Sequence, residues 1–140
     1  MFRVIHVAIL VFVAVAGLTS LNASAQTPND ILATIKNDAK SADPTFQGFS
    51  AERGASFFKE KHGNELSCSS CHTDNPAASG KHAKTGKIIK PMAPAANPER
   101  FTDPAKVAKW FKRNCNDVLG RVCTPQEKGD VITYLLTVKG

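Results

Sequence analysis

Apolar side chains recur at helical spacing in four segments beyond residue 25, and each segment opens with a residue type that caps helices. The first covers residues 27–39 and the second residues 50–61. The third opens at Asp103 and the fourth at Thr124, each with proline at the first helical position. No stretch alternates apolar and polar residues as a convincing strand would. The pattern predicts an all-α fold.

Gly54 stands inside the second predicted helix, where a glycine costs about 1 kcal/mol relative to alanine. It shares one side of that helix with Ala51, Ala55 and Phe58. A glycine within a helix usually has a packing reason. We therefore expect another helix to approach closely at Gly54.

Residues 73–102 show no sustained period, and Pro76, Pro91, Pro94 and Pro98 prevent a long helix there. A segment of this length without secondary structure is unusual in a compact domain unless it wraps another group. We expect it to cover one face of a cofactor.

The first 25 residues have the plan of a cleavable signal peptide. Arg3 precedes an apolar run too short to span a bilayer, and Ala23-Ser24-Ala25 is a typical cleavage site. We therefore predict a periplasmic protein whose mature chain, residues 26–140, forms one small domain. The formal net charge of +6 is a mild excess that favours acidic protein partners over nucleic acid.

Cys68-Ser69-Ser70-Cys71-His72 is the C-x-x-C-H sequence that attaches haem. The two thiols add to the vinyl groups of the porphyrin, and the adjacent histidine becomes an axial ligand of the iron. The motif predicts one covalent haem c, bound by Cys68 and Cys71 and ligated by His72. Two cysteines remain, and in an oxidising compartment Cys115 and Cys123 are expected to pair.

Other readings of the cysteines fit less well. A thioredoxin-like redox pair needs a β-α-β context, which the helical pattern does not offer. A zinc site needs a second ligand pair at closer spacing than Cys115 and Cys123.

The lysine-rich stretch after Gly80 has Ile88 where a phosphate-binding loop needs serine or threonine. We interpret its lysines as a solvated loop face, with docking of an acidic redox partner as the less favoured alternative; they are Lys81, Lys84, Lys87 and Lys90. The other histidines of the mature chain, His62 and His82, are expected to have structural or surface roles.

Two residues compete as the sixth ligand of the iron. Met92 is the only methionine beyond the signal peptide, but it follows His72 closely for a ligand loop. Asn114 continues an apolar stripe of the third helix, formed by Val107, Trp110 and Phe111, and precedes Cys115. The residues alone leave both open.

Residues 50–138 resemble the sphaeroides haem protein family, a branch of the class I cytochromes c. The resemblance is carried by Arg113-Asn114-Cys115 and by Gly120-Arg121-Val122-Cys123-Thr124, and also by residues 85–88, 91–94 and 101–103. It implies a small class I cytochrome c fold and a ferric haem ligated by His72 and Asn114. It further implies that Asn114 leaves on reduction and that a Cys115–Cys123 disulfide lies beside it. Cytochrome c″, a related type, has histidine at the position of Asn114.

The predicted function is electron transfer with binding of O₂, NO or CO by the ferrous haem, because an amide oxygen suits ferric iron better than ferrous iron. The resemblance implies a dihaem cytochrome c and a membrane b-type cytochrome as redox partners. The first alternative is a simple electron carrier with His72 and Met92 as ligands. A haem enzyme acting on nitrogen oxides or peroxide ranks third, because no distal acid or base stands at a recognisable spacing.

Overall fold

The computed structural model describes residues 26–140, so the predicted signal peptide, residues 1–25, lies outside the described residues. The elements are α1 (Pro28–Ala42), α2 (Ala51–Lys59), α3 (Ser69–His72), β1 (Gly80–Lys81), β2 (Ile88–Ile89), α4 (Pro104–Leu119) and α5 (Pro125–Thr137). In this part of the chain no helix is both long enough and apolar enough to cross a membrane. The predicted all-α fold is confirmed.

Helix starts agree with the sequence pattern because they depend on local capping. The side chains of Thr27, Ser50, Asp103 and Thr124 each accept a hydrogen bond from the backbone N–H three residues later. The ends differ: α1 continues to Ala42, and α2 stops at Lys59.

A one-turn helix and a short two-stranded ladder were not expected. Helix α3 spans a single turn, and β1 pairs with β2 as an antiparallel ladder of two residues each. Neither is long enough to produce a period in the sequence.

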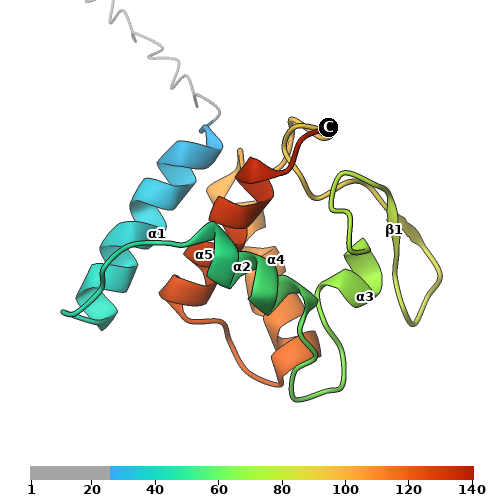
Figure 1. Ribbon diagram of the computed structural model, residues 1–140, viewed down its shortest axis with the longest axis horizontal. Helices are drawn as coiled ribbons and strands as arrows, with labels where there is room; N and C mark the ends of the chain where they lie inside the picture. The colour runs from blue at the N-terminus through green and yellow to red at the C-terminus, as the bar shows by residue number, and fades with distance from the viewer. Residues whose placement is uncertain (1–25) are drawn as a thin grey trace, which may run out of the picture.

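The hydrophobic core lies where α1 and α2 both pack against α5 (Figure 1). Its buried side chains are Ile31, Ile35, Phe58, Phe101, Val131, Ile132 and Leu135. Gly54 lies at the crossing of α2 and α5, where an added Cβ would overlap the carbonyl group of Asp130. The predicted close approach of a helix at Gly54 is confirmed.

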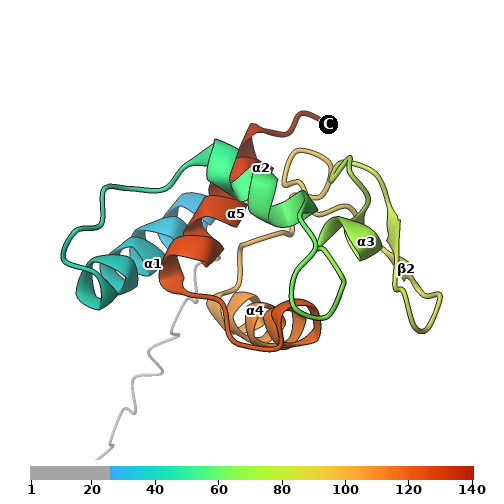
Figure 2. The same ribbon diagram turned by 60° about the horizontal axis from the view of Figure 1, so that its bottom comes forward.

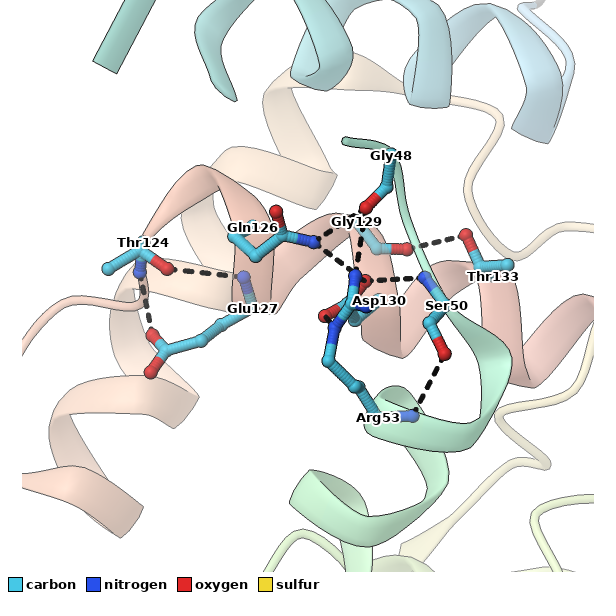
Figure 3. Close-up of polar contacts among 9 residues, drawn as sticks. All are labelled: Gly48, Ser50, Arg53, Thr124, Gln126, Glu127, Gly129, Asp130 and Thr133. Atoms are coloured by element: carbon cyan, nitrogen blue, oxygen red, sulfur yellow. Dashed lines mark hydrogen bonds and ion pairs between the residues drawn. The ribbon is translucent and has the colours of Figure 1, made fainter. Parts of the chain in front are cut away.

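The buried carboxylate of Asp130 links α2 and α5 at the same crossing by hydrogen bonds (Figure 3). Asp130 accepts hydrogen bonds from the backbone N–H of Ser50 at 2.7 Å and from the side chain of Gln126 at 2.9 Å. The guanidinium of Arg53 donates to both of its oxygens, at 2.8 and 2.9 Å. Because every donor comes from the ends of α2 or α5 or the segment before α2, the network fixes how these helices cross.

Helix α4 stands apart from the α2–α5 pair in Figure 2. Val107 and Phe111 pack against the core, and the other end of the helix is held by the loop after α2. There Asn64 donates its backbone N–H to the carbonyl of Val118 at 3.2 Å and its side-chain amide to that of Asp117 at 3.0 Å. This loop runs directly into the C-x-x-C-H motif, so it links α4 to the attachment site.

Candidate haem site

Helix α3 and its N-cap residue Cys68 bring the two cysteines and the histidine of the attachment motif onto one helical turn. The backbone N–H of His72 donates to the carbonyl of Cys68 at 3.0 Å, and that of Cys71 donates to the same carbonyl at 3.3 Å. The turn begins with a reciprocal pair, in which Ser67 and Ser70 each accept the other's backbone N–H at 3.0 Å. Local hydrogen bonds therefore set the backbone positions of Cys68, Cys71 and His72.

Cys68 and Cys71 are free thiols, whereas Cys115 and Cys123 are bonded to each other. Burial raises the pKa of the Cys68 thiol to about 11. Thioredoxin-like pairs need a thiol of lowered pKa, so this environment disfavours a redox pair. The bond between the other two cysteines also removes them as partners in a zinc site. Both observations fit thiols that become thioethers.

His72 is half-buried, and its Nδ1 is buried without a hydrogen-bond partner among residues 26–140. Burial, together with the positive charge of Arg100, lowers the pKa of His72 to about 4. The imidazole is therefore neutral at physiological pH, which is the form that ligates metals. An unpaired buried ring nitrogen is costly in a purely structural histidine, so His72 fits the role of iron ligand.

Arg100 is a residue of this site that the sequence did not single out. Its guanidinium donates to the carbonyls of Pro91 at 2.8 Å and Lys90 at 2.7 Å, and burial lowers its pKa. Arg100 forms no ion pair with a carboxylate in the described part of the chain. A half-buried cation without a counter-ion fits a site that receives a group carrying carboxylates, as haem does. A single arginine in an aperiodic segment gives no sequence signal for this.

Met92 lies on the segment that is tied to the chain just after His72. The backbone N–H groups of Met92 and Ala93 donate to the carbonyl of Pro76 at 2.8 and 3.0 Å. The Met92 side chain is partly buried and packs against the core. These contacts give Met92 a packing role.

Asn114 is half-buried on α4, immediately before the buried Cys115. Its side-chain amide makes no hydrogen bond with the described residues. The Cys115–Cys123 disulfide, with Cα atoms 5.6 Å apart, joins the C-terminal half of α4 to the start of α5. The predicted pairing is present, and it fixes the backbone next to Asn114.

The apolar stripe of α4 is narrower than the sequence predicts. Val107 and Phe111 face the core, but Trp110 is 46% exposed. The cationic groups of Lys109 and Arg113 lie 5.6 and 5.7 Å from the centroid of the Trp110 ring. Trp110 therefore lies on the flank of the helix, one turn before Asn114. Its ring is partly exposed to solvent and contacts the two cationic side chains.

The turn between the two bonded cysteines is braced by an ion pair. The guanidinium of Arg121 donates to both carboxylate oxygens of Glu127, at 2.8 and 2.6 Å. This contact lowers the pKa of Glu127, which also caps α5 by accepting the N–H of Thr124 at 2.7 Å. Arg121 therefore connects the turn between the bonded cysteines to α5, which contributes three side chains to the hydrophobic core.

The histidines outside the motif have local roles, as expected. The Nε2 of His62 bonds the carbonyl of Phe57 at 2.8 Å, and its ring lies against that of Phe57 with the centroids 4.5 Å apart. The Nδ1 of His82 accepts the backbone N–H of Thr85 at 3.2 Å.

Comparisons with known proteins agree with this site. Residues 44–135 match a family described as a domain of unknown function (DUF1924). Cytochrome c″ of Methylophilus methylotrophus is 49% identical over 105 residues, covering 72% of this chain and 73% of that protein. The cytochrome c-type protein SHP of Cereibacter sphaeroides is 48% identical over 89 residues, covering 61% and 68%.

Solved structures of the same two proteins have this fold. The crystal structure of oxidised cytochrome c″ superposes with a TM-score of 0.72 at 44% identity, covering 81% of this chain and 95% of that one. The structure of oxidised SHP gives 0.68 at 38% identity, covering 80% and 97%. Together with the attachment motif, these likenesses show that the chain is a c-type cytochrome with covalently bound haem c and belongs to the family of cytochrome c″ and SHP.

Proposed function

We propose that this chain is a periplasmic monohaem cytochrome in which Asn114 is the sixth iron ligand of the oxidised protein and detaches on reduction. Residues 26–140 form the mature protein in this proposal. The observation that carries it is the half-buried amide of Asn114, which lacks a hydrogen-bond partner among the described residues and lies beside the Cys115–Cys123 bond.

Two relatives support the proposal by what has been described for them. The structure of SHP is described as that of an oxygen-binding cytochrome c. A solution structure of cytochrome c″ is described as giving insights into haem-ligand detachment. For this chain we infer the same combination, namely a ligand that detaches and a site that then accepts a diatomic gas.

Haem, when bound, would supply a redox-active iron that takes protein ligands. His72 would be one of these ligands in both oxidation states, because Cys68 and Cys71 would hold it in place. The amide oxygen of Asn114 is a hard, neutral donor that prefers ferric iron. Since Asn114 belongs to the same chain, it acts at high effective concentration and holds ferric iron despite weak intrinsic affinity. On reduction that preference would be lost, so Asn114 would withdraw and leave access for O₂, NO or CO.

A closed carrier with Met92 as ligand is the main alternative. The contacts of Met92 disfavour it, because its backbone is bonded to Pro76 and its side chain contributes to the core. We further propose electron exchange with other redox proteins, a dihaem cytochrome c and a membrane b-type cytochrome being those that the family resemblance implies.

Carbon monoxide distinguishes the two ligand sets. The dithionite-reduced holoprotein should shift its Soret band when CO is added, and the oxidised holoprotein should not respond. Asn114→Met is the matched variant, because a thioether binds ferrous iron well and should abolish the response. A reduced wild-type protein that fails to bind CO would contradict the open-site proposal and favour Met92.

A further inference from the structure

The segment from residue 80 to 90, called here the basic hairpin, is a short β-hairpin. Gly80 pairs with Ile89 and Lys81 with Ile88. Beyond the ladder, the N–H of His82 donates to the carbonyl of Lys87 at 2.8 Å, and the N–H of Gly86 donates to that of His82 at 2.9 Å. The side chains on this turn are therefore presented by a defined backbone.

The basic hairpin lies against the attachment motif. The backbone N–H of Ala83 donates to the sulfur of Cys71 at 3.4 Å. At the base of the hairpin, a Cβ added to Gly80 would overlap the carbonyl of Cys71. The hairpin therefore covers one of the two sulfurs that carry the haem, and a protein that contacts it comes close to the redox centre.

The outer surface of the basic hairpin combines an exposed apolar side chain with positive charge. Ile88 is 75% exposed and is the cross-strand partner of Lys81. The hairpin also carries Lys84, Lys87 and Lys90, and all four lysines are exposed. The sequence contains no acidic residue between Asp74 and Glu99. The Lys90–Glu99 pair, 3.8 Å apart, joins two largely exposed side chains and neutralises little of this charge.

We propose that the basic hairpin is the docking surface for an acidic electron-transfer protein, with Ile88 at the centre of the contact. The partner surface would carry carboxylates around an apolar patch, which is the complement of what the hairpin presents. The partner gives up one electron and the oxidised cytochrome gains it, so no covalent bond changes between the proteins. This inference rests on the proposed electron-transfer function.

The outer face of α4 is also basic, but acidic residues stand among its cations and an aromatic ring lies beside two of them. Lys106 pairs with Asp103 at 3.5 Å, and Lys109 and Arg113 lie over the ring of Trp110. The carboxylate of Asp117 lies on the same shallow groove, which Val122 also lines. Residues 80–90 contain no acidic residue, so the basic hairpin is the more uniformly positive of the two faces.

The two basic faces provide matched variants for a kinetic test. The hairpin variant carries Lys81→Glu, Lys84→Glu and Lys87→Glu, and the control carries Lys106→Glu, Lys109→Glu and Lys112→Glu. Both change the net charge equally. The probe is fully reduced flavodoxin, a small acidic electron-transfer protein, mixed with oxidised holoprotein by stopped flow at several ionic strengths.

Electrostatic steering is worth about 10- to 1,000-fold in association rate at low salt. The hairpin variant should therefore lose roughly 10-fold or more in the bimolecular rate and most of its salt dependence, with a much smaller loss in the control. Ile88→Ser should slow the reaction and leave its salt dependence unchanged, since it removes an apolar contact only. Equal losses in both triple variants, or a larger loss in the α4 variant, would overturn the assignment.

Spectroelectrochemical titration of each variant separates this proposal from the proposed function. All variants should be reduced reversibly at similar potentials, because the substitutions are exposed. If the wild-type protein itself is not reversibly reduced at the electrode, the electron-transfer function fails. If it is reduced reversibly and the hairpin variant reacts with flavodoxin at the wild-type rate, only the docking surface is wrong.

Discussion

At the α2–α5 crossing, the buried carboxylate of Asp130 accepts hydrogen bonds from Ser50, Arg53 and Gln126. Around the attachment motif the pattern is the opposite. The Nδ1 of His72 is buried without a partner in the described part of the chain, Arg100 forms no ion pair there, and the Asn114 amide makes no hydrogen bond. Because native proteins rarely leave a buried polar atom such as this ring nitrogen unpaired, the first region is complete as polypeptide and the second fits a site that receives the haem.

The largest effect should come from removing both attachment sulfurs. A Cys68→Ala/Cys71→Ala variant should lose its haem to acid-acetone, whereas the wild-type polypeptide should keep the mass of one haem. His72 alone cannot replace two covalent bonds. Extraction of haem from the wild-type protein would refute covalent attachment.

Asp130→Ala should destabilise the α2–α5 crossing and leave the haem chemistry unchanged. We expect a loss of about 2–4 kcal/mol in the free energy of unfolding, because several donors lose their acceptor. Chemical denaturation of the holoprotein measures it, and Glu52→Gln, an exposed change on the partner helix α2, should stay within about 0.5 kcal/mol of wild type. A shift in the ferric ligand bands of the folded Asp130→Ala variant would show that the α2–α5 crossing and the haem site are not independent.

Replacing the disulfide should have a smaller effect on stability and a specific effect on the site. For Cys115→Ser/Cys123→Ser we expect a loss of about 2–3 kcal/mol, since the closed loop is short. The same variant should hold Asn114 less firmly, so the ferric ligand bands that depend on Asn114 should weaken in the oxidised protein. Alkylation of both cysteines in unreduced, denatured wild-type protein would show that the bond is absent in solution.

The smallest effect concerns the ion pair that braces the disulfide turn. The folded protein holds the pKa of Glu127 below its ordinary value of 4.5. The stabilisation is therefore present above about pH 4.5 and is lost as the pH falls through the lower folded value. Because the pair is partly exposed, it should contribute less than about 1 kcal/mol. Glu127→Gln should flatten this part of the pH dependence of unfolding, and an unchanged profile would argue against the pairing.

The two regions also differ in how far the sequence predicts them. Local signals were sufficient for the helix starts, for the close approach at Gly54 and for the attachment motif. The Arg53–Asp130 pair joins residues 77 positions apart, and such a contact leaves no local trace. Trp110 was placed on the core stripe because its spacing fits, but the helix turns it toward Lys109 and Arg113. The contacts of Arg100 likewise depend on how an aperiodic segment folds.

The absorption spectrum of the ferric holoprotein, compared between Asn114→Ala and Met92→Ala, tests the central claim most directly. Asn114→Ala should convert the ferric haem to an open or water-ligated form while covalent attachment and the helical fold are retained. Met92→Ala should leave the ferric ligand bands unchanged, because Met92 packs and does not ligate in this account. If Met92→Ala changes those bands and Asn114→Ala does not, Met92 is the ligand and the gas-binding proposal is contradicted.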